Sequence, residues 1–189
     1  MRNNIVSGFS LIEIILSIAL LGIIAMIVVP NFSGRVPLYQ RKEFISTLNA
    51  VVRRAWVKTI ESAHPHKIVF NLNQRTLKIQ ERTQQQDAAG KFIFKDIHAQ
   101  YIKSGFVWDE RYKIENFYVE GVDEVGRHAT GSQLEDIWFF IVPEGLAQEA
   151  IINILDTQDA TDGNEGRQIG LVLNPFSVEF EVYDDYQRP

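Results

Sequence analysis

The chain has 189 residues, with 19 Lys and Arg against 24 Asp and Glu, and a formal net charge of −5. This acidic balance argues against a general nucleic-acid binder, which usually carries a basic excess. Cysteine is absent, which excludes disulfide scaffolds, cysteine-ligated zinc and cysteine nucleophiles.

The apolar residues are concentrated near the N-terminus. Residues 9–30 have the sequence FSLIEIILSIALLGIIAMIVVP, in which 17 of 22 positions are apolar and only Glu13 is charged. A helix of ~20 residues covers the ~30 Å hydrocarbon core, so this run predicts a membrane-spanning helix. It is longer than the ~7–15 residues of a secretory signal, and no small-x-small cleavage site follows it. Residues 1–8, MRNNIVSG, hold one Arg and no acid, which favours a cytoplasmic N-terminus.

Glu13 needs a special explanation within this run. A carboxylate inside a membrane-spanning segment is costly, so we expect a partner that compensates its charge. The alternative is a side chain at the membrane interface that extends to water.

The junction from Gly8 to Glu13, GFSLIE, resembles the type III signal sequence of type IV prepilins and type II secretion pseudopilins. That pattern has a glycine, a phenylalanine directly after it, and a glutamate at the fifth position after the glycine, followed by an apolar helix. Gly8, Phe9 and Glu13 match it, and Pro30 falls where such proteins commonly carry a helix-kinking proline. The resemblance covers about 30 of the 189 residues.

The resemblance implies a sequence of processing steps. A prepilin peptidase would remove residues 1–8 by cutting after Gly8 and would then methylate the new amine of Phe9. Residues 9–30 would form a transmembrane and fibre-core helix, in which Glu13 pairs with the ammonium of a neighbouring subunit. The implied partners are other pseudopilins and an inner-membrane secretion platform. The implied location is the bacterial inner membrane, with the C-terminal domain in the periplasm.

An amphipathic helix is predicted to continue this spine through residues 31–62. Gly34 and Pro37 weaken the helix at its start, so we expect a kink or loosened stretch there. From Gln40 to Ser62 the apolar positions recur at helical spacing: Phe44, Leu48, Val51 and Ala55, flanked by Ile45, Val52, Trp56 and Ile60. Pro65 then ends the helix.

Residues 63–189 are predicted to form a β-rich domain. Residues 67–72 and 76–82 alternate around a short turn and predict a hairpin, and residues 83–90 predict a polar loop. Further strands are predicted at 91–97, 113–122, 136–143, 149–156, 167–174 and 177–184, whereas residues 98–112 are ambiguous. The expected fold is α+β and pilin-like, with a long N-terminal helix, hydrophobic then amphipathic, packed on an antiparallel β-sheet or β-sandwich.

Within the pilin-like class, the order of these segments is similar to that of H-type minor pseudopilins and the related FimT-like proteins (the GspH/FimT-like family). Both have an amphipathic helix, a polar turn, a hairpin, and a late strand that ends in a Pro-acidic-Gly turn, here Pro143-Glu144-Gly145. The resemblance implies a minor pseudopilin of a type II secretion system. Two alternatives stay open: a minor pilin of a type IV pilus, acting in pilus assembly or DNA uptake, and a membrane-anchored periplasmic binding module or enzyme.

Other candidate sites are weaker. Four carboxylates could ligate calcium, but their spacing is not that of an EF-hand, so a solvated acidic loop is the preferred interpretation; they are Asp156, Asp159, Asp162 and Glu165. His64 and His66 are interpreted as capping or exposed residues. The basic residues of the amphipathic helix are interpreted as a solvated face; they are Arg41, Lys42, Arg53, Arg54 and Lys58.

Three tryptophans are interpreted as core residues, Trp138 among them, in a run that predicts a buried strand. No nucleophile, metalloprotease or phosphate-loop motif is present in the sequence. We therefore expect no enzymatic activity and no cofactor.

Overall fold

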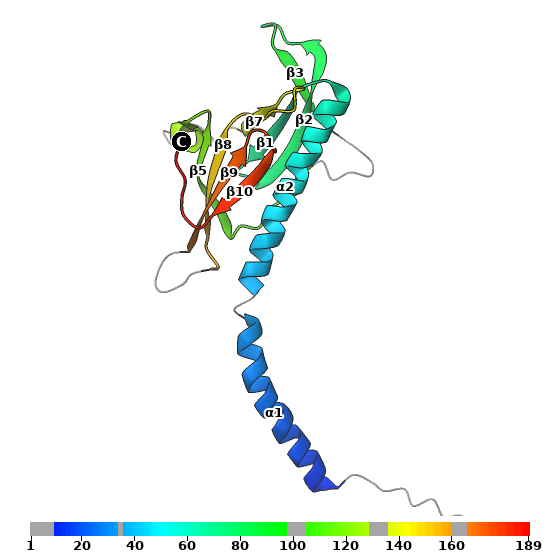
Figure 1. Cartoon of the computed structure of the whole chain (residues 1–189), viewed down its shortest axis with the longest axis vertical. Coiled ribbons are helices and arrows are strands. Elements are labelled where there is room, and N and C mark those ends of the chain that lie inside the picture. The colour runs from blue at the N-terminus through cyan, green and yellow to red at the C-terminus, as the bar shows by residue number, and fades with distance from the viewer. Residues whose placement is uncertain (1–9, 34–35, 98–104, 129–135, 160–165) are drawn as a thin grey trace, which may run out of the picture. The chain divides into compact units, whose positions relative to one another are not determined.

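The computed structural model describes residues 10–33, 36–97, 105–128, 136–159 and 166–189 (Figure 1). The chain divides into two compact units, Met1–Arg41 and Lys42–Pro189. Each unit is considered by itself.

The first unit consists mainly of helix α1, Leu11–Ser33. Its first turn contains Glu13, and the backbone N–H of Glu13 donates to the carbonyl oxygen of Ser10 at 3.0 Å. Within the described residues, no helix combines the length and the hydropathy needed to cross a membrane.

Helix α2, Val36–Ser62, begins with Pro37 in its first turn, where the missing N–H of proline removes no helical hydrogen bond. It ends at Ser62 and is followed by Ala63, whose φ of 54° is left-handed, as is common directly after a helix. The predicted apolar stripe is confirmed for Leu48, Val51, Val52 and Ala55, which are all buried. It is wrong for Ile60, which is 48% exposed, because Thr59, four residues after Ala55, takes the inward position of that turn and is fully buried.

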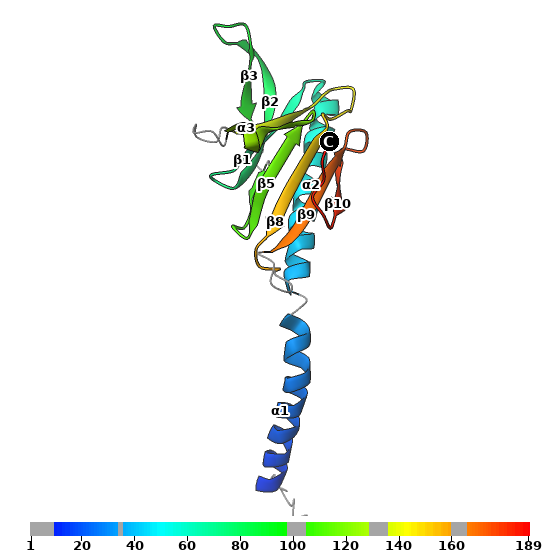
Figure 2. The ribbon, with the colours of Figure 1, turned by 90° about the vertical axis from the view of Figure 1, so that its left-hand side faces the viewer.

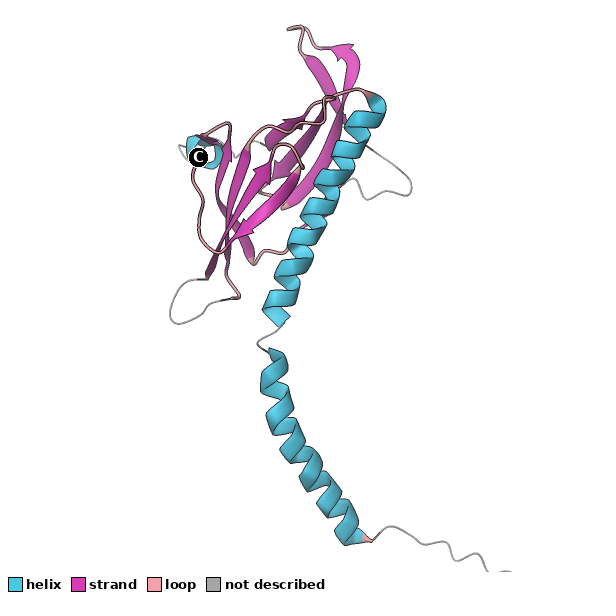
Figure 3. Cartoon of the chain, in the orientation of Figure 1, coloured by secondary structure: helices cyan, strands magenta, loops and turns pink. Residues whose placement is uncertain are grey.

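The first sheet has the strand order β3-β2-β1-β7, with β4 paired to β2. Figure 3 draws the strands of both sheets in magenta and the helices in cyan. Its strands are β1 (His66–Asn71), β2 (Thr76–Gln86), β3 (Phe92–Asp96), β4 (Gly105–Val107) and β7 (Ile137–Ile141). The predicted hairpin is confirmed, since Ile68 pairs with Ile79 and Phe70 pairs with Leu77. The predicted loop at 83–90 is wrong for its first half, because β2 extends to Gln86 and pairs there with Phe92 of β3.

The second sheet has the order β10-β9-β8-β5-β6 and is entirely antiparallel (Figure 2). Its strands are β5 (Tyr112–Val119), β6 (Val122–Asp123), β8 (Ala150–Asp156), β9 (Arg167–Asn174) and β10 (Glu179–Tyr183). The prediction of one strand over 113–122 is wrong at its end. Glu120 and Gly121 both have positive φ, 49° and 80°, and they turn the chain into β6. A short helix, α3 (Glu124–His128), follows β6.

The hydrophobic core lies between the two sheets and the buried face of α2. Phe70 of β1 meets Phe117 of β5 edge to face, with ring centroids 4.9 Å apart. Phe44 of α2 stacks on Tyr112 of β5 at 4.4 Å and contacts Phe106 of β4 at 6.0 Å. One helix therefore closes the gap between both sheets, and the expected α+β arrangement of a helix on antiparallel sheets is confirmed.

Trp138 is not a core residue, contrary to the prediction. It points to the outer face of the first sheet and is 40% exposed, because the alternation of β7 directs Ile137, Phe139 and Ile141 inward instead. Its ring lies 4.1 Å from the Nζ atom of Lys67. Burial lowers the pKa of the Lys67 ammonium, and Asp136 partly opposes this shift.

The segment that follows β10 lies against the outer face of the second sheet. The buried amide of Asn153, in the middle of β8, donates to the carbonyl oxygen of Gln187 and accepts from its N–H, both at 2.9 Å. A Cβ atom at Gly170 of β9 would collide with the carbonyl oxygen of Asp185. Glycine is therefore required at this position for the segment to approach the sheet.

Candidate assembly site

The described side chains of α1, through Met26, are all exposed. The large apolar side chains among them are Leu11, Ile12, Ile14, Ile15, Leu16, Ile18, Leu20, Leu21, Ile23, Ile24 and Met26. A helix that is apolar on every side is stable only when lipid or other helices cover it. This segment is therefore a candidate surface for assembly.

Glu13 is the only charged residue of this helix. Its position in the first turn is electrostatically favourable, because the N-terminus of a helix carries partial positive charge. Its carbonyl oxygen accepts a hydrogen bond from the Ser17 hydroxyl at 2.7 Å. Its carboxylate forms no salt bridge with the described part of the chain.

The structure describes only some of the other residues predicted for the N-terminal site. Gly8 and Phe9, the predicted cleavage and methylation residues, lie outside the described residues. Pro30 lies inside α1, whose described backbone continues helically to Ser33. The kink predicted there therefore stays a prediction.

The acidic loop differs from the prediction at its first residue. Asp156 ends β8, is fully buried, and receives two hydrogen bonds from Arg111, from Nε at 2.8 Å and from an Nη atom at 2.7 Å. It is therefore a structural carboxylate and not a solvated one. Asp159 lies 3.7 Å from Arg167, whereas Asp162 and Glu165 lie outside the described residues. No group of three or more potential metal ligands gathers in the part of the chain that the structure describes.

Arg111 falls in the segment whose periodicity is ambiguous, which is why sequence reasoning missed this ion pair. Two hydrogen bonds from Thr157 to the carbonyl oxygen of Arg111, at 3.0 and 3.1 Å, tie the same two strand ends together. The hydrogen bonds to Asp156 raise the pKa of the Arg111 guanidinium. The sequence indicated this buried charge only through one acid, Asp156, at the end of an apolar strand.

The two histidines after α2 have structural contacts. His66 is buried, and its Nδ1 atom lies 2.9 Å from the Thr59 hydroxyl and 3.0 Å from the carbonyl oxygen of His64. The Thr59 hydroxyl donates to the carbonyl oxygen of Ala55, so it accepts from Nδ1–H of His66. Burial lowers the pKa of His66. The interpretation of His66 as exposed is therefore wrong, while its contact with Thr59 lies in the last turn of α2.

On the basic face of α2, which holds five basic residues, Arg53 and Lys58 pair with acids. Arg53 donates to Glu179 of β10 at 2.6 Å, and Lys58 donates to Glu61 at 2.6 Å. Asn49 on the same helix exchanges two hydrogen bonds with the backbone of Phe180 at 3.2 and 2.8 Å. These contacts cover part of the edge of β10, so this face helps to join α2 to the second sheet.

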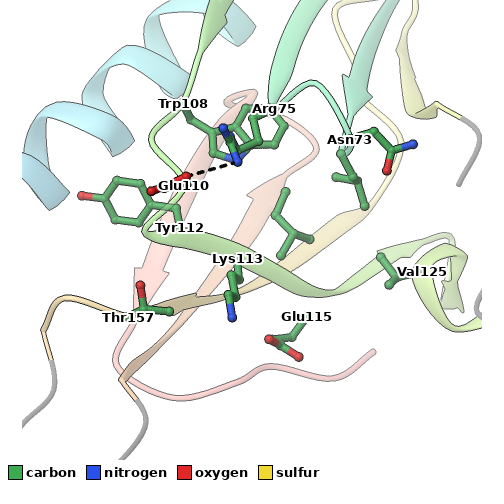
Figure 4. Close-up of a pocket in the computed structure, with 11 residues that line it drawn as sticks. Asn73, Arg75, Trp108, Glu110, Tyr112, Lys113, Glu115, Val125 and Thr157 are labelled. Carbon is green, nitrogen blue, oxygen red and sulfur yellow. Dashed lines mark ion pairs between the residues drawn. The ribbon is translucent and has the colours of Figure 1, made fainter.

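An open hollow of about 650 Å³ lies beside the start of β5 (Figure 4). Its apolar surface comes from Leu72, Trp108, Ile114 and Val125. Its rim carries charges of both signs, among them Arg75 and Glu110, which are 3.8 Å apart. No histidine or serine is among the described residues that line it.

Comparison with known proteins identifies the fold. No family model and no curated protein sequence matches the chain. Among solved structures, one of the minor pseudopilin EpsH from the type 2 secretion system of Vibrio cholerae matches with a TM-score of 0.52 and 9% identity, over 79% of this chain and 97% of that chain. A second structure of the same protein matches with a TM-score of 0.49 and 10% identity, over 76% and 95%. The chain therefore has the pilin-like fold of a minor pseudopilin.

Proposed function

We propose that the chain is a minor pseudopilin of a type II secretion system, of the H type. It is cleaved between Gly8 and Phe9, methylated at Phe9, and assembled into a periplasmic pseudopilus that drives protein export. Its partners are prepilin peptidase, other pseudopilins and the inner-membrane secretion platform. Its role is structural rather than enzymatic.

The observation that carries this proposal is the combination of a pilin-like domain with an exposed apolar helix that holds one acid in its first turn. A domain of this fold has its own core and needs no such helix for stability. The helix therefore serves another purpose, which we propose to be membrane anchoring before assembly and fibre packing afterwards, with residues 9–30 as the segment concerned. The N-terminus is cytoplasmic and the β-rich domain periplasmic in this account.

Glu13 has a specific role in the proposed assembly. Cleavage leaves a methylated ammonium at Phe9, and the carboxylate of Glu13 pairs with that ammonium on a neighbouring subunit. Such a pair compensates a charge that would otherwise be buried alone, which is strongly unfavourable. Glu13 thereby sets the register between adjacent helices.

The experiment compares Glu13→Ala and Glu13→Lys with wild type in cells that carry the secretion system. We expect normal removal of residues 1–8 but at least a tenfold loss of incorporation into sheared pseudopili. Glu43→Ala is the matched control, because Glu43 is an exposed glutamate on α2. Normal incorporation of both Glu13 variants would refute the role in register.

A further inference from the structure

Three aromatic rings gather around one ammonium group on the outer face of the first sheet. The Nζ atom of Lys67 lies 4.1 Å from the centre of the Trp138 ring and 4.6 Å from that of Phe94. The centre of the Phe140 ring is 5.6 Å from the same atom. The rings also contact one another, since Phe140 lies 4.7 Å from Trp138 and 5.5 Å from Phe94. These four residues are here called the Lys67 face.

The pairing of the strands explains why these side chains meet outside the core. Lys67 of β1 pairs directly with Phe140 of β7, so the two side chains lie on the same side of the sheet. Trp138, two residues before Phe140, points to that side as well and is 40% exposed. Lys67, Phe94 and Phe140 are half-buried. The Lys67 face is therefore an ordered aromatic surface that solvent reaches.

The contacts of Lys67 with the rings suit a further contact with an anion. A ring face attracts the positive charge of the ammonium but offers no oxygen lone pair to its three N–H donors. Burial lowers the pKa of this ammonium, so part of its hydration has already been lost. A carboxylate that binds Lys67 therefore displaces less water than it would from a fully exposed lysine, and the rings shield the resulting pair.

The charge distribution favours an acidic partner. Residues 66–97, which form β1, β2 and β3, hold six Lys and Arg against three Asp and Glu, although the whole chain has a net charge of −5. Two acids flank β1 in the order of the sheet, Asp96 at the end of β3 and Asp136 directly before β7. They would repel a nucleic acid or an anionic membrane, whose negative charges are spread evenly. A protein surface can instead place a single carboxylate between them.

We propose that the Lys67 face binds an acidic side chain of a different pseudopilin, with the carboxylate on the ammonium and the aromatic rings against apolar atoms of the same partner. Aromatic residues within a rim of paired polar groups are the usual centre of a protein interface. The rim pairs here are Asn71 with Asp136 at 2.7 Å and Gln80 with Asp96 at 2.9 Å. A minor subunit has other pseudopilins as neighbours, so this inference rests on the proposed function and adds the surface of the β-domain that makes the contact.

The test titrates the full-length chain in detergent with each of the other full-length pseudopilins of the same secretion system, one at a time. Lys67→Met removes the charge and keeps the length, Lys67→Arg keeps the charge, and Trp138→Ala removes the most exposed ring. We expect one pseudopilin to bind, with a Kd at least about tenfold higher for Lys67→Met and Trp138→Ala and within about threefold of wild type for Lys67→Arg. Binding should weaken as the salt concentration rises, and less steeply for Lys67→Met.

The controls are Lys113→Met and Phe176→Ala, at an exposed lysine and an exposed phenylalanine of the second sheet and its turn. Each should change the Kd by less than about twofold, as expected of residues outside the interface. Lys67 and Trp138 lie outside the core, so their variants should keep the thermal midpoint of wild type, which separates loss of binding from unfolding.

Four results would overturn the inference. They are no binding by any pseudopilin of the system, wild-type binding by Lys67→Met and Trp138→Ala, a Lys67→Arg variant as weak as Lys67→Met, and a dimer of this chain that Lys67→Met abolishes. Reconstitution of the full chain with brominated phosphatidylglycerol tests lipid as the occupant, and quenching of tryptophan fluorescence that Trp138→Ala lacks would also overturn it. Failure of the proposed function is distinguishable, since it is measured by removal of residues 1–8 and by the Glu13 variants, in which the Lys67 face is intact.

Discussion

The buried pair of Arg111 and Asp156 gives the clearest test of how the β-domain is held together. The two side chains are 2% and 0% exposed and share two short hydrogen bonds. Asp156→Ala leaves the Arg111 guanidinium buried without its counter-charge, which costs about 3–5 kcal/mol. Folded domains are stable by only about 5–15 kcal/mol, so this variant should lose a large part of its stability.

The assay is urea and thermal unfolding of residues 36–189, which contain all of the core residues from Phe44 to Phe180. Asp156→Ala should lower the midpoint temperature by about 6–20 °C, at ~2–4 °C per kcal/mol. The double variant Arg111→Met/Asp156→Leu should recover most of the loss, because it removes both charges and keeps the volume filled.

The control is Glu179→Ala, which breaks the pair of Arg53 and Glu179. Those side chains are 64% and 45% exposed, so the loss should stay below about 1 kcal/mol. A cost below about 1 kcal/mol for Asp156→Ala, or a double variant as unstable as the sum of the single ones, would refute the reasoning.

Two further predictions concern the same domain. Gly170→Ala should destabilise the domain by about 1–3 kcal/mol, since the new Cβ atom collides with the backbone of Asp185. It should also speed amide hydrogen exchange at Gln187. Unchanged exchange would contradict the close approach of the C-terminal segment to β9. Burial lowers the pKa of His66 in the folded state, so the unfolded chain binds more protons as pH falls. The free energy of unfolding should therefore be at its full value above pH ~6.5 and should decrease as the pH falls below it. The decrease in the free energy of unfolding with falling pH should be smaller in His66→Asn than in wild type. An equal decrease in that variant would contradict the attribution of the effect to His66.

Local patterns predicted most of the strands because their alternation is maintained by burial on one face. Residues 167–174 form β9 as predicted, and residues 149–156 differ from β8 by one residue. The predicted strand at 113–122 was too long because a two-residue turn at Glu120 and Gly121 was not recognised. Trp138 was misplaced because hydrophobicity alone does not say which face of an apolar strand is inward, whereas the register against β1 does.

The residues of a candidate site could be predicted only where they lie close together in the sequence. Gly8, Phe9 and Glu13 lie within six positions, so a short motif suffices to propose their role. Arg111 and Asp156 are 45 residues apart and meet only because β5 and β8 pair. The hollow combines residues from the β1–β2 turn, β5 and α3, and no single segment of the sequence indicates it.

The measurement that tests the central claim most directly is the intact mass of the full chain after co-expression with a prepilin peptidase. The account predicts loss of residues 1–8 and gain of one methyl group on Phe9. An inactive peptidase variant serves as the control and should leave the mass unchanged. An unchanged mass with the active enzyme, or cleavage at any other bond, would contradict assignment of this chain to the pilin-like class.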